Sequence, residues 1–386
     1  MATGFYWDEK CFWHAGGNYA LTLPLGDFVQ PLAAGGLPEN PETKRRLKNL
    51  IEVSGLIDAL AVCKPPPASR EDLERFHAPR YLDELEAGSR RGLGDGGDCA
   101  PYTAGSLAAA KQSAGLAIAA IEDVALGRRG NAYALCRPPG HHAEADRGRG
   151  FCLLGNIPVA VRRARALGQV GRVAILDWDV HHGNGSQAAF YDDPEVLTIS
   201  LHQAGNYPLD TGEFDEQGKG AGLGGNLNLP LPPGCGTDAY HYAMRRLVLP
   251  ALAAFRPELI VVACGFDACG KDPLGKMLLN SSAFATMTAQ LKGLAEQLCE
   301  GRLVMIHEGG YSEGYVPLCG HAVIARLAGS AIDVPDPQDA EIAAWGYQAL
   351  QPHQRELIDD WRRGWSAYAD LDAADGVVAD LLKTPE

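Results

Sequence analysis

The stretch Asp177-Trp178-Asp179-Val180-His181-His182-Gly183-Asn184-Gly185 is the part of the sequence from which the fold can be worked out. It follows 172–176, a short apolar run of the kind that forms a fully buried strand. The polar residues therefore begin where the strand ends, and in open α/β sheets ligands bind at that carboxyl end. Asp179 and His181 are two positions apart, so on an extended backbone their side chains point the same way. A carboxylate and an imidazole that converge suit a divalent metal such as zinc, although an isolated pair of this kind is more often part of a cap or a loop.

Strand-like and helix-like runs alternate along most of the chain. Short apolar runs predict strands at 4–7, 132–136, 172–176, 196–201, 259–263 and 303–307. Helices are expected at 104–126, 157–167, 238–255, 284–299 and 315–327. This alternation predicts an α/β fold with a doubly wound, mostly parallel sheet and helices on both faces. No repeat or linker is visible, so we expect one domain over 1–386, with a core at about 5–332 and a helical tail at about 336–386.

Composition and charge exclude several classes of protein. The 386 residues are 46% hydrophobic and 21% charged, which is typical of a soluble globular protein with a large core. A formal charge of −14 argues against nonspecific binding to nucleic acid. No apolar run is long enough to cross a membrane, and Met1–Lys10 has no signal-peptide pattern. Ten scattered cysteines without a C-x-x-C motif indicate reduced thiols, and hence a cytoplasmic location.

Polar residues follow five of the predicted strands. The five stretches are 137–142 (RPPGHH), 177–185 (DWDVHHGNG), 200–202 (SLH), 265–267 (GFD) and 307–311 (HEGGY). If these strand ends lie at one edge of the sheet, Asp179, His181 and Asp267 supply three metal ligands. Three protein ligands with a fourth position open are typical of a catalytic zinc site, whereas structural sites are closed and usually rich in Cys.

The motifs RPPGHH, GFC, DWDVHHGNG, ISLH, GFDA, DPL and EGGY together resemble those of the zinc-dependent histone deacetylase superfamily. The resemblance is closest to the class II-like bacterial amidohydrolases, which include acetylpolyamine-hydrolysing enzymes, and it covers roughly Phe5 to Ile332. It implies an arginase-like α/β fold with the active site at the carboxyl ends of the strands. It also implies potassium ions near the site and hydrolysis of the amide of an acylated lysine peptide or a small acylamine. The zinc ligands it implies are Asp179, His181 and Asp267.

The resemblance assigns catalytic roles to five further residues. His141 and His142 match the tandem histidines of the family, and Tyr311 matches its transition-state tyrosine. His142 is expected to take a proton from water and return one to the leaving amine. His141, backed by Asp177, is expected to stay more cationic. Asn184 stands where class I members carry an Asp, and a neutral partner should leave His142 less basic.

A substrate channel is also implied. The residues expected to contact substrate are Asp98, Gly150, Phe151, Tyr207, Leu274 and Gly310. Phe151 and Tyr207 match two aromatic positions that enclose the methylenes of acyl-lysine, although the second is usually Phe in close relatives. Asp98 matches a rim aspartate that accepts hydrogen bonds from substrate backbone amides. Leu274 stands at the mouth, where members that prefer acetylpolyamines can carry a Glu, so the sequence favours acyl-lysine peptides.

Two potassium sites are implied as well. The residues expected at the inner site are Asp177, Asp179, His181, Ser200 and Leu201. The residues expected at the outer site are Phe190, Asp193 and Val196.

Other functions remain open at this point. An acetylpolyamine or small-acylamine hydrolase would use the same residues. A dinuclear ureohydrolase on the same fold needs more carboxylates, typically a D-x-D where this chain has only Asp267. A non-catalytic acyl-lysine binding module would be expected to lack the tyrosine, and Tyr311 is present. We expect no nucleic-acid or membrane partner, and the long loop at 7–38 is a candidate interface for a homo-oligomer, either a dimer or a tetramer.

Overall fold

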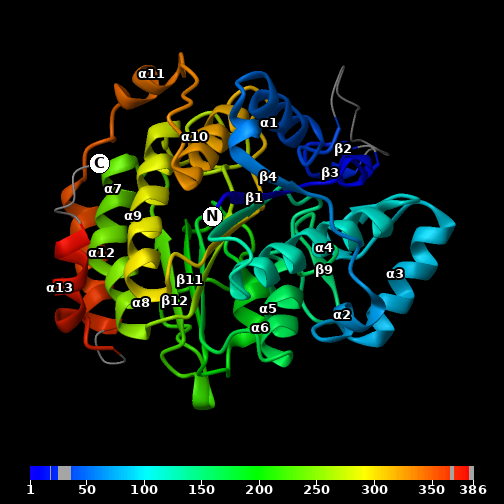
Figure 1. Cartoon of the computed structure of the whole chain (residues 1–386), viewed down its shortest axis with the longest axis horizontal. Helices are drawn as coiled ribbons and strands as arrows, with labels where there is room; N and C mark the ends of the chain where they lie inside the picture. Colours follow the sequence, from blue (N-terminus) through cyan, green and yellow to red (C-terminus); the bar gives the residue numbers. More distant parts are fainter. Residues whose placement is uncertain (18, 25–35, 366–368, 382–386) are drawn as a thin grey trace.

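Eight strands form the central sheet of the computed structural model, which describes residues 1–17, 19–24, 36–365 and 369–381 (Figure 1). Their order across the sheet is β12-β11-β10-β13-β14-β8-β1-β4, and every neighbouring pair is parallel. The strands are β1 (Thr3–Tyr6), β4 (Leu60–Cys63), β8 (Asn131–Ala134), β10 (Val173–Asp177), β11 (Val196–Gln203), β12 (Asn226–Leu231), β13 (Leu259–Cys264) and β14 (Leu303–His307). The predicted parallel α/β sheet is confirmed, and all six predicted strands are present.

Two strands of the sheet were not predicted, and both lie at its edges. β12 contains Asn226, Asn228 and Pro230, a pattern that does not resemble a buried strand. The edge position tolerates Pro230, and the side chains of both asparagines donate to Oε1 of Gln187 at 2.8 Å. β4, at the other edge, has only four residues. Apolar periodicity therefore located the interior of the sheet better than its edges.

Helices cover both faces of the sheet, as a parallel sheet requires. In Figure 1, α7, α8 and α9 lie on one side of the strands, and α5 and α6 on the other. The helices are α1 (Glu42–Val53), α2 (Arg70–Glu74), α3 (Pro79–Arg91), α4 (Ser106–Ala125), α5 (Asn156–Ala166), α6 (Asn184–Phe190), α7 (Thr237–Ala243), α8 (Leu249–Phe255), α9 (Ser281–Cys299), α10 (Val316–Ala328), α11 (Asp339–Ala343), α12 (Pro352–Trp365) and α13 (Leu371–Leu381). In the described parts of the chain, none is long and apolar enough to cross a membrane.

The helix expected at 238–255 is continuous but irregular. A π-helical turn, Met244–Val248, separates α7 from α8. Pro250 has no N–H with which to bond the carbonyl of Arg246, and a proline within a helix commonly produces such a local adjustment. The freed Arg246 carbonyl accepts a hydrogen bond from Nη1 of Arg362 in α12 at 2.6 Å. The irregular turn thus provides an attachment point for the tail.

The predicted helical tail packs firmly against the body of the protein. α12 contacts α7 and β12, and α13 contacts α8. Trp361, Trp365, Leu371 and Val378 join the main hydrophobic core. The single-domain organisation stays a prediction, although these contacts favour it. The loop at 7–38, proposed as an interface, falls partly outside the described residues, because 18 and 25–35 are not among them.

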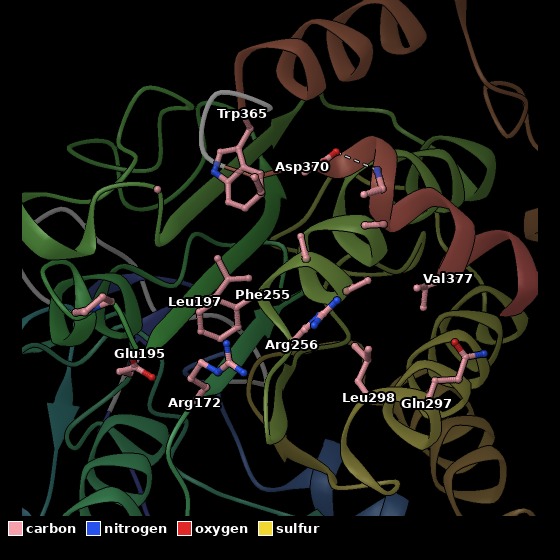
Figure 2. Close-up of a pocket in the computed structure, with 17 residues that line it drawn as sticks. Arg172, Glu195, Leu197, Phe255, Arg256, Gln297, Leu298, Trp365, Asp370 and Val377 are labelled. Atoms are coloured by element: carbon pink, nitrogen blue, oxygen red, sulfur yellow. Dashed lines mark hydrogen bonds between the residues drawn. The ribbon is translucent and has the colours of Figure 1, made fainter.

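The tail also completes a wide pocket of about 1070 Å³ at the amino end of the sheet (Figure 2). Arg172 precedes β10, Leu197 lies in β11, and Arg256 follows α8. Trp365 of α12 and Val377 of α13 also line the pocket. None of the residues of the polar strand ends lines this pocket.

Candidate active site

The polar strand ends meet at the carboxyl edge of the sheet, as the sequence predicts. Hydrogen bonds from backbone N–H groups to side-chain carboxylates join them directly. The N–H of Val180, after β10, donates to Oδ1 of Asp267 at 2.7 Å, and the N–H of Gly309, after β14, donates to Oδ2 of Asp179 at 2.8 Å. The N–H of Gly140, after β8, donates to Oε2 of Glu308 at 2.6 Å. Four loops that are far apart in sequence therefore position one another.

Asp179, His181 and Asp267 form a fully assembled group of candidate metal ligands. One ligand atom from each residue lies within 4.8 Å of the others, and all three residues are buried. Nδ1 of His181 is 3.1 Å from Oδ1 of Asp179 and 3.1 Å from Oδ2 of Asp267. The structure therefore brings together the three ligands that the sequence predicts.

The surroundings of this group suit a divalent cation. Burial and the neighbouring Asp179 both raise the pKa of Asp267, because two carboxylates share a site shielded from water. A bound cation would relieve that repulsion, and oxygen and imidazole nitrogen are ligands that zinc accepts. Gly265 and Gly309 contribute space, since a Cβ at Gly265 would overlap the Asp179 carboxylate and one at Gly309 would overlap the carboxylates of Asp179 and Asp267. The residues therefore fit a metal, and the sequence pattern alone predicts no role for either glycine.

The tandem histidines lie side by side, with their ring centroids 3.9 Å apart, but have different partners. Nδ1 of His141 lies 2.9 Å from Oδ2 of Asp177, and Nδ1 of His142 lies 2.8 Å from Oδ1 of Asn184. Burial alone would lower the pKa of His141, but the charges of Asp179 and Asp177 outweigh it and raise this pKa to about 10. Burial and the neighbouring His141 hold the pKa of His142 well below its usual value.

A pocket of about 300 Å³ opens from this group to the surface. Its lining residues are Thr22, Cys99, His142, Gly150, Phe151, His181, Asn206, Tyr207, Leu274 and Tyr311. The structure thus places four of the six predicted substrate residues in the wall. Asp98 is not a lining residue, but its Oδ2 accepts a hydrogen bond from the hydroxyl of the lining residue Tyr207 at 2.9 Å. Gly310 is not a lining residue, because a Cβ there would face Val316 and Phe266.

Close packing at Gly150 and Phe151 shapes the pocket wall. A Cβ at Gly150 would overlap the ring of His142 and come within 2.7 Å of the ring of Tyr207. Phe151 adopts a φ of 67°, a left-handed conformation that is rare for an aromatic residue and that clusters at functional sites. Its ring lies edge-on to Tyr311, with centroids 5.8 Å apart. This strained backbone directs the Phe151 ring into the pocket.

Two buried carboxylates support the site, although no role is predicted for them from the sequence. Oδ2 of Asp272 accepts a hydrogen bond from the N–H of Tyr311 at 2.7 Å, and Oδ1 accepts one from the N–H of Leu274 at 2.8 Å. Oε2 of Glu308 accepts a hydrogen bond from the N–H of His141 at 3.1 Å in addition to that from Gly140. Both residues lie inside quoted motifs, DPL and EGGY, but their bonds to Tyr311, Gly140 and His141 join positions distant in sequence and leave no local signal.

Glu308 also belongs to a second group whose donor atoms lie within 4.8 Å of one another, with His141 and Cys152. Burial raises the pKa of Glu308 to about 7 and that of the Cys152 thiol well above its usual value. Metal ligands have to be deprotonated, so these groups are better suited to hydrogen bonding than to metal binding. We assign this group a supporting role.

Residues of each predicted potassium site are neighbours in the structure. Asp177 pairs with Ser200 across β10 and β11. In the turn before β11, the N–H of Asp193 donates to the carbonyl of Phe190 at 3.0 Å, and the N–H of Val196 donates to the carbonyl of Asp193 at 3.3 Å. The Asp193 carboxylate forms an ion pair with Arg165. Potassium at either place stays a prediction.

Comparisons with known proteins agree with this geometry. Residues 37–327 match the family model described as histone deacetylase domain. The chain is 55% identical to a histone deacetylase-like amidohydrolase of Pseudomonas aeruginosa, covering 87% of this chain and 88% of that protein. It is 36% identical to a probable deacetylase of Archaeoglobus fulgidus, with 86% and 94% covered. The crystal structure of the HDA15 HD domain superposes with a TM-score of 0.83 at 29% identity, covering 100% of this chain and 99% of that one. The chain therefore belongs to the histone deacetylase family, and its fold and hydrolase type are those of the family's deacetylases and amidohydrolases.

Proposed function

We propose that this protein hydrolyses N-acyl amides with one bound zinc ion, and that acyl-lysine peptides are its preferred substrates. The observation that carries the proposal is a single pocket in which His142, Tyr311 and His181 of the candidate metal group share the lining. A pocket that combines a base, a hydroxyl donor and a metal ligand suits hydrolysis better than simple binding.

Zinc held by Asp179, His181 and Asp267 would polarise the acyl carbonyl and make water more acidic. His142 is suited to accept the proton of the attacking water, because burial and the neighbouring His141 keep it neutral. As the C–N bond breaks, His142 gives this proton to the leaving nitrogen, so that the amine departs neutral and the acyl group leaves as a carboxylic acid.

Two other groups would stabilise charge in the transition state. The hydroxyl of Tyr311 is placed to donate a hydrogen bond to the carbonyl oxygen as negative charge develops there. His141, held by Asp177 and kept protonated by the surrounding carboxylates, would act electrostatically beside His142. Asn184 orients His142 without adding charge.

The substrate preference rests on the pocket mouth. Phe151 and Tyr207 give the channel aromatic walls that suit the lysine methylenes. Half-buried Leu274 offers no charge to the internal ammonium of a polyamine, which would lose hydration without compensation. Exposed carboxylates at the rim, Asp98 and Asp210, support the second candidate, an acetylpolyamine hydrolase, because they attract polycations.

A turnover screen distinguishes these candidates. The protein is assayed with acetyl-lysine peptides, acetylspermidine and acetylputrescine, before and after treatment with a chelator and after zinc is restored. We expect the peptides to give the highest kcat/KM, and the chelator to abolish activity until zinc returns. Faster hydrolysis of the acetylpolyamines would select the second candidate. Binding of the peptides without any turnover would instead favour a non-catalytic acyl-lysine binding module.

Potassium remains an expectation carried by the family resemblance, and location and assembly remain expectations from the sequence. We propose potassium at the inner and outer sites defined by Asp177 with Ser200, and by Phe190 with Asp193 and Val196. A cytoplasmic location is proposed from the scattered cysteines, and a homo-oligomer from the long loop at 7–38.

A further inference from the structure

Arg149, which immediately precedes the pocket residues Gly150 and Phe151, is a nearly buried arginine at the rim. Its side chain is only 6% exposed. The guanidinium bonds both oxygens of Asp210, with Nη2 at 2.9 Å from Oδ1 and Nη1 at 3.2 Å from Oδ2. Nη2 also donates to Oδ2 of Asp98 at 3.3 Å. Such a two-pronged contact fixes geometry as well as charge.

The same Asp98 oxygen holds the Tyr207 side chain. The hydroxyl of Tyr207 donates to it at 2.9 Å, and the guanidinium of Arg149 lies 5.8 Å from the centre of the Tyr207 ring. The Tyr207 ring in turn lies edge-on to His142, with centroids 5.1 Å apart, and forms part of the pocket wall. Phenylalanine at this position would lack the hydroxyl that makes the link.

Arg149 is also linked to His142 through Glu144 and Asn184. Nη1 donates to Oε1 of Glu144 at 2.9 Å, and the same oxygen accepts from Nδ2 of Asn184 at 2.9 Å. Asn184 is the partner of His142. Arg149 therefore joins the short strand β6 (Gly97–Asp98), its neighbour β9 (Gly148–Arg149) and the loop that carries Asp210 to the surroundings of His142.

We propose that Arg149 is a positioning residue that determines specificity, holding Asp98 and Tyr207 together as a rim that recognises the substrate backbone. The inference rests on the proposed deacylation. The Asp98 side chain is still 46% exposed, so it can accept further hydrogen bonds from a substrate. A peptide with amides on both sides of its acyl-lysine can use that acceptor, whereas N-pentylacetamide, which matches the acylated side chain but has no donor at its far end, cannot. Arg149 should therefore matter for peptides and much less for small neutral acylamines.

The experiment compares kcat and KM for an acetyl-lysine tripeptide amide and for N-pentylacetamide. We expect Arg149→Met to raise the KM of the peptide about tenfold, equivalent to one or two lost hydrogen bonds. The KM of N-pentylacetamide should change less than about threefold. Its kcat should also stay within about threefold, because Nδ2 of Asn184 still donates to the His142 carbonyl at 3.2 Å. Tyr207→Phe, which removes only the hydroxyl, should raise the KM of the peptide by about threefold.

Three further variants separate positioning from stability. Arg149→Lys keeps the positive charge but lacks the two-pronged guanidinium, so it should give an intermediate KM for the peptide. It also serves as the test if Arg149→Met proves to be unfolded. Arg147→Met is the matched control, since this arginine is 47% exposed and pairs with the other Glu144 oxygen. It should leave both KM values within about twofold. In an Asp98→Ala background, which lacks the acceptor oxygens, adding Arg149→Met should raise the KM of the peptide no further, because Arg149 acts on the substrate through Asp98.

The outcomes also separate this inference from the function on which it rests. Equal KM changes for both substrates, or independent losses in the double variant, would overturn the inference alone. A wild-type protein that hydrolyses neither substrate would overturn the proposed function, and this inference with it.

Discussion

The two pockets of this protein differ in a way that size does not explain. The pocket at the amino edge of the sheet measures about 1070 Å³, whereas the one at the carboxyl edge measures about 300 Å³. Among the described residues, both groups of His, Cys, Asp and Glu that are close enough to hold a metal lie at the carboxyl edge. The amino-edge pocket instead mixes apolar side chains from α8, α9 and the tail with charged residues.

The difference teaches that convergence of buried polar groups marks chemistry better than volume does. At the carboxyl edge, loops donate backbone N–H groups to carboxylates of other loops, as Val180 does to Asp267 and Gly309 to Asp179. Desolvating these carboxylates costs free energy, and the fold retains them only where other groups compensate. At the amino edge, the pocket is what remains where the tail helices meet the body. We therefore expect mutations at the two edges to have very different effects.

The largest expected effect is at the metal group. Asp179→Asn keeps the shape of the side chain but removes one ligand charge, and we expect the bound metal and turnover both to be lost. Metal content measured by elemental analysis, together with kcat, tests this, and Asp267→Asn should behave alike. The melting curve shows whether the variant is folded. Full zinc content in both folded variants would refute the assignment of these ligands.

The next largest effect is expected at Tyr311. Tyr311→Phe should lower kcat by about 10²–10³, or about 3–4 kcal/mol in the activation barrier, because one hydrogen bond to the developing oxyanion is lost. Metal content should not change. Tyr315→Phe is the matched control, since its hydroxyl accepts from the N–H of Ser281 at 2.9 Å, away from the pocket. It should lower stability by about 1 kcal/mol with kcat unchanged. Equal kcat values for the two variants would make Tyr311 a structural residue.

A smaller effect is expected at the mouth of the carboxyl-edge pocket. Leu274→Glu should shift the ratio of kcat/KM values from acetyl-lysine peptide toward acetylspermidine by about 1–3 kcal/mol, the range of a charge-assisted contact. The backbone of Leu274 is held by Asp272 and Asn206, so the exchange should leave its position unchanged. Leu274→Gln, which has the same shape without the charge, should shift the ratio much less. If the two variants behave alike, charge at this position does not set the preference.

The smallest effect is expected at the amino-edge pocket. Arg256 ends α8 with a φ of 53°, a left-handed conformation that favours glycine. Arg256→Gly should therefore raise the free energy of unfolding by about 0.5–1 kcal/mol, measured by urea denaturation. Its kcat/KM should stay within about twofold of the wild type. A fivefold change would show that this pocket communicates with the chemistry and would weaken the contrast between the two edges.

The sequence predicts the two edges unequally. Interior strands such as β10 and β13 are continuous apolar runs, and the candidate ligands Asp179, His181 and Asp267 follow them within a few residues, so short-range pattern locates them. The strand β12 is not predicted because its buried asparagines donate hydrogen bonds to Gln187, and no local sequence pattern encodes this contact. The roles of Asp272, Glu308 and Arg149 are hidden for the same reason. The amino-edge pocket depends on where the tail packs, which periodicity does not reveal.

The place of β1 in the sheet has a consequence for how such proteins are divided. Residues 37–327 are the part recognised as the family's domain, yet β1 (Thr3–Tyr6) lies between β8 and β4 within the sheet. A protein fragment cut to the recognised part would leave β4 without its neighbour β1. It would also lack α12 and α13, and would expose the core surface that Trp361 and Trp365 cover. We expect the unit that evolution inherits as a foldable piece to be longer at both ends than the unit by which relatives are recognised.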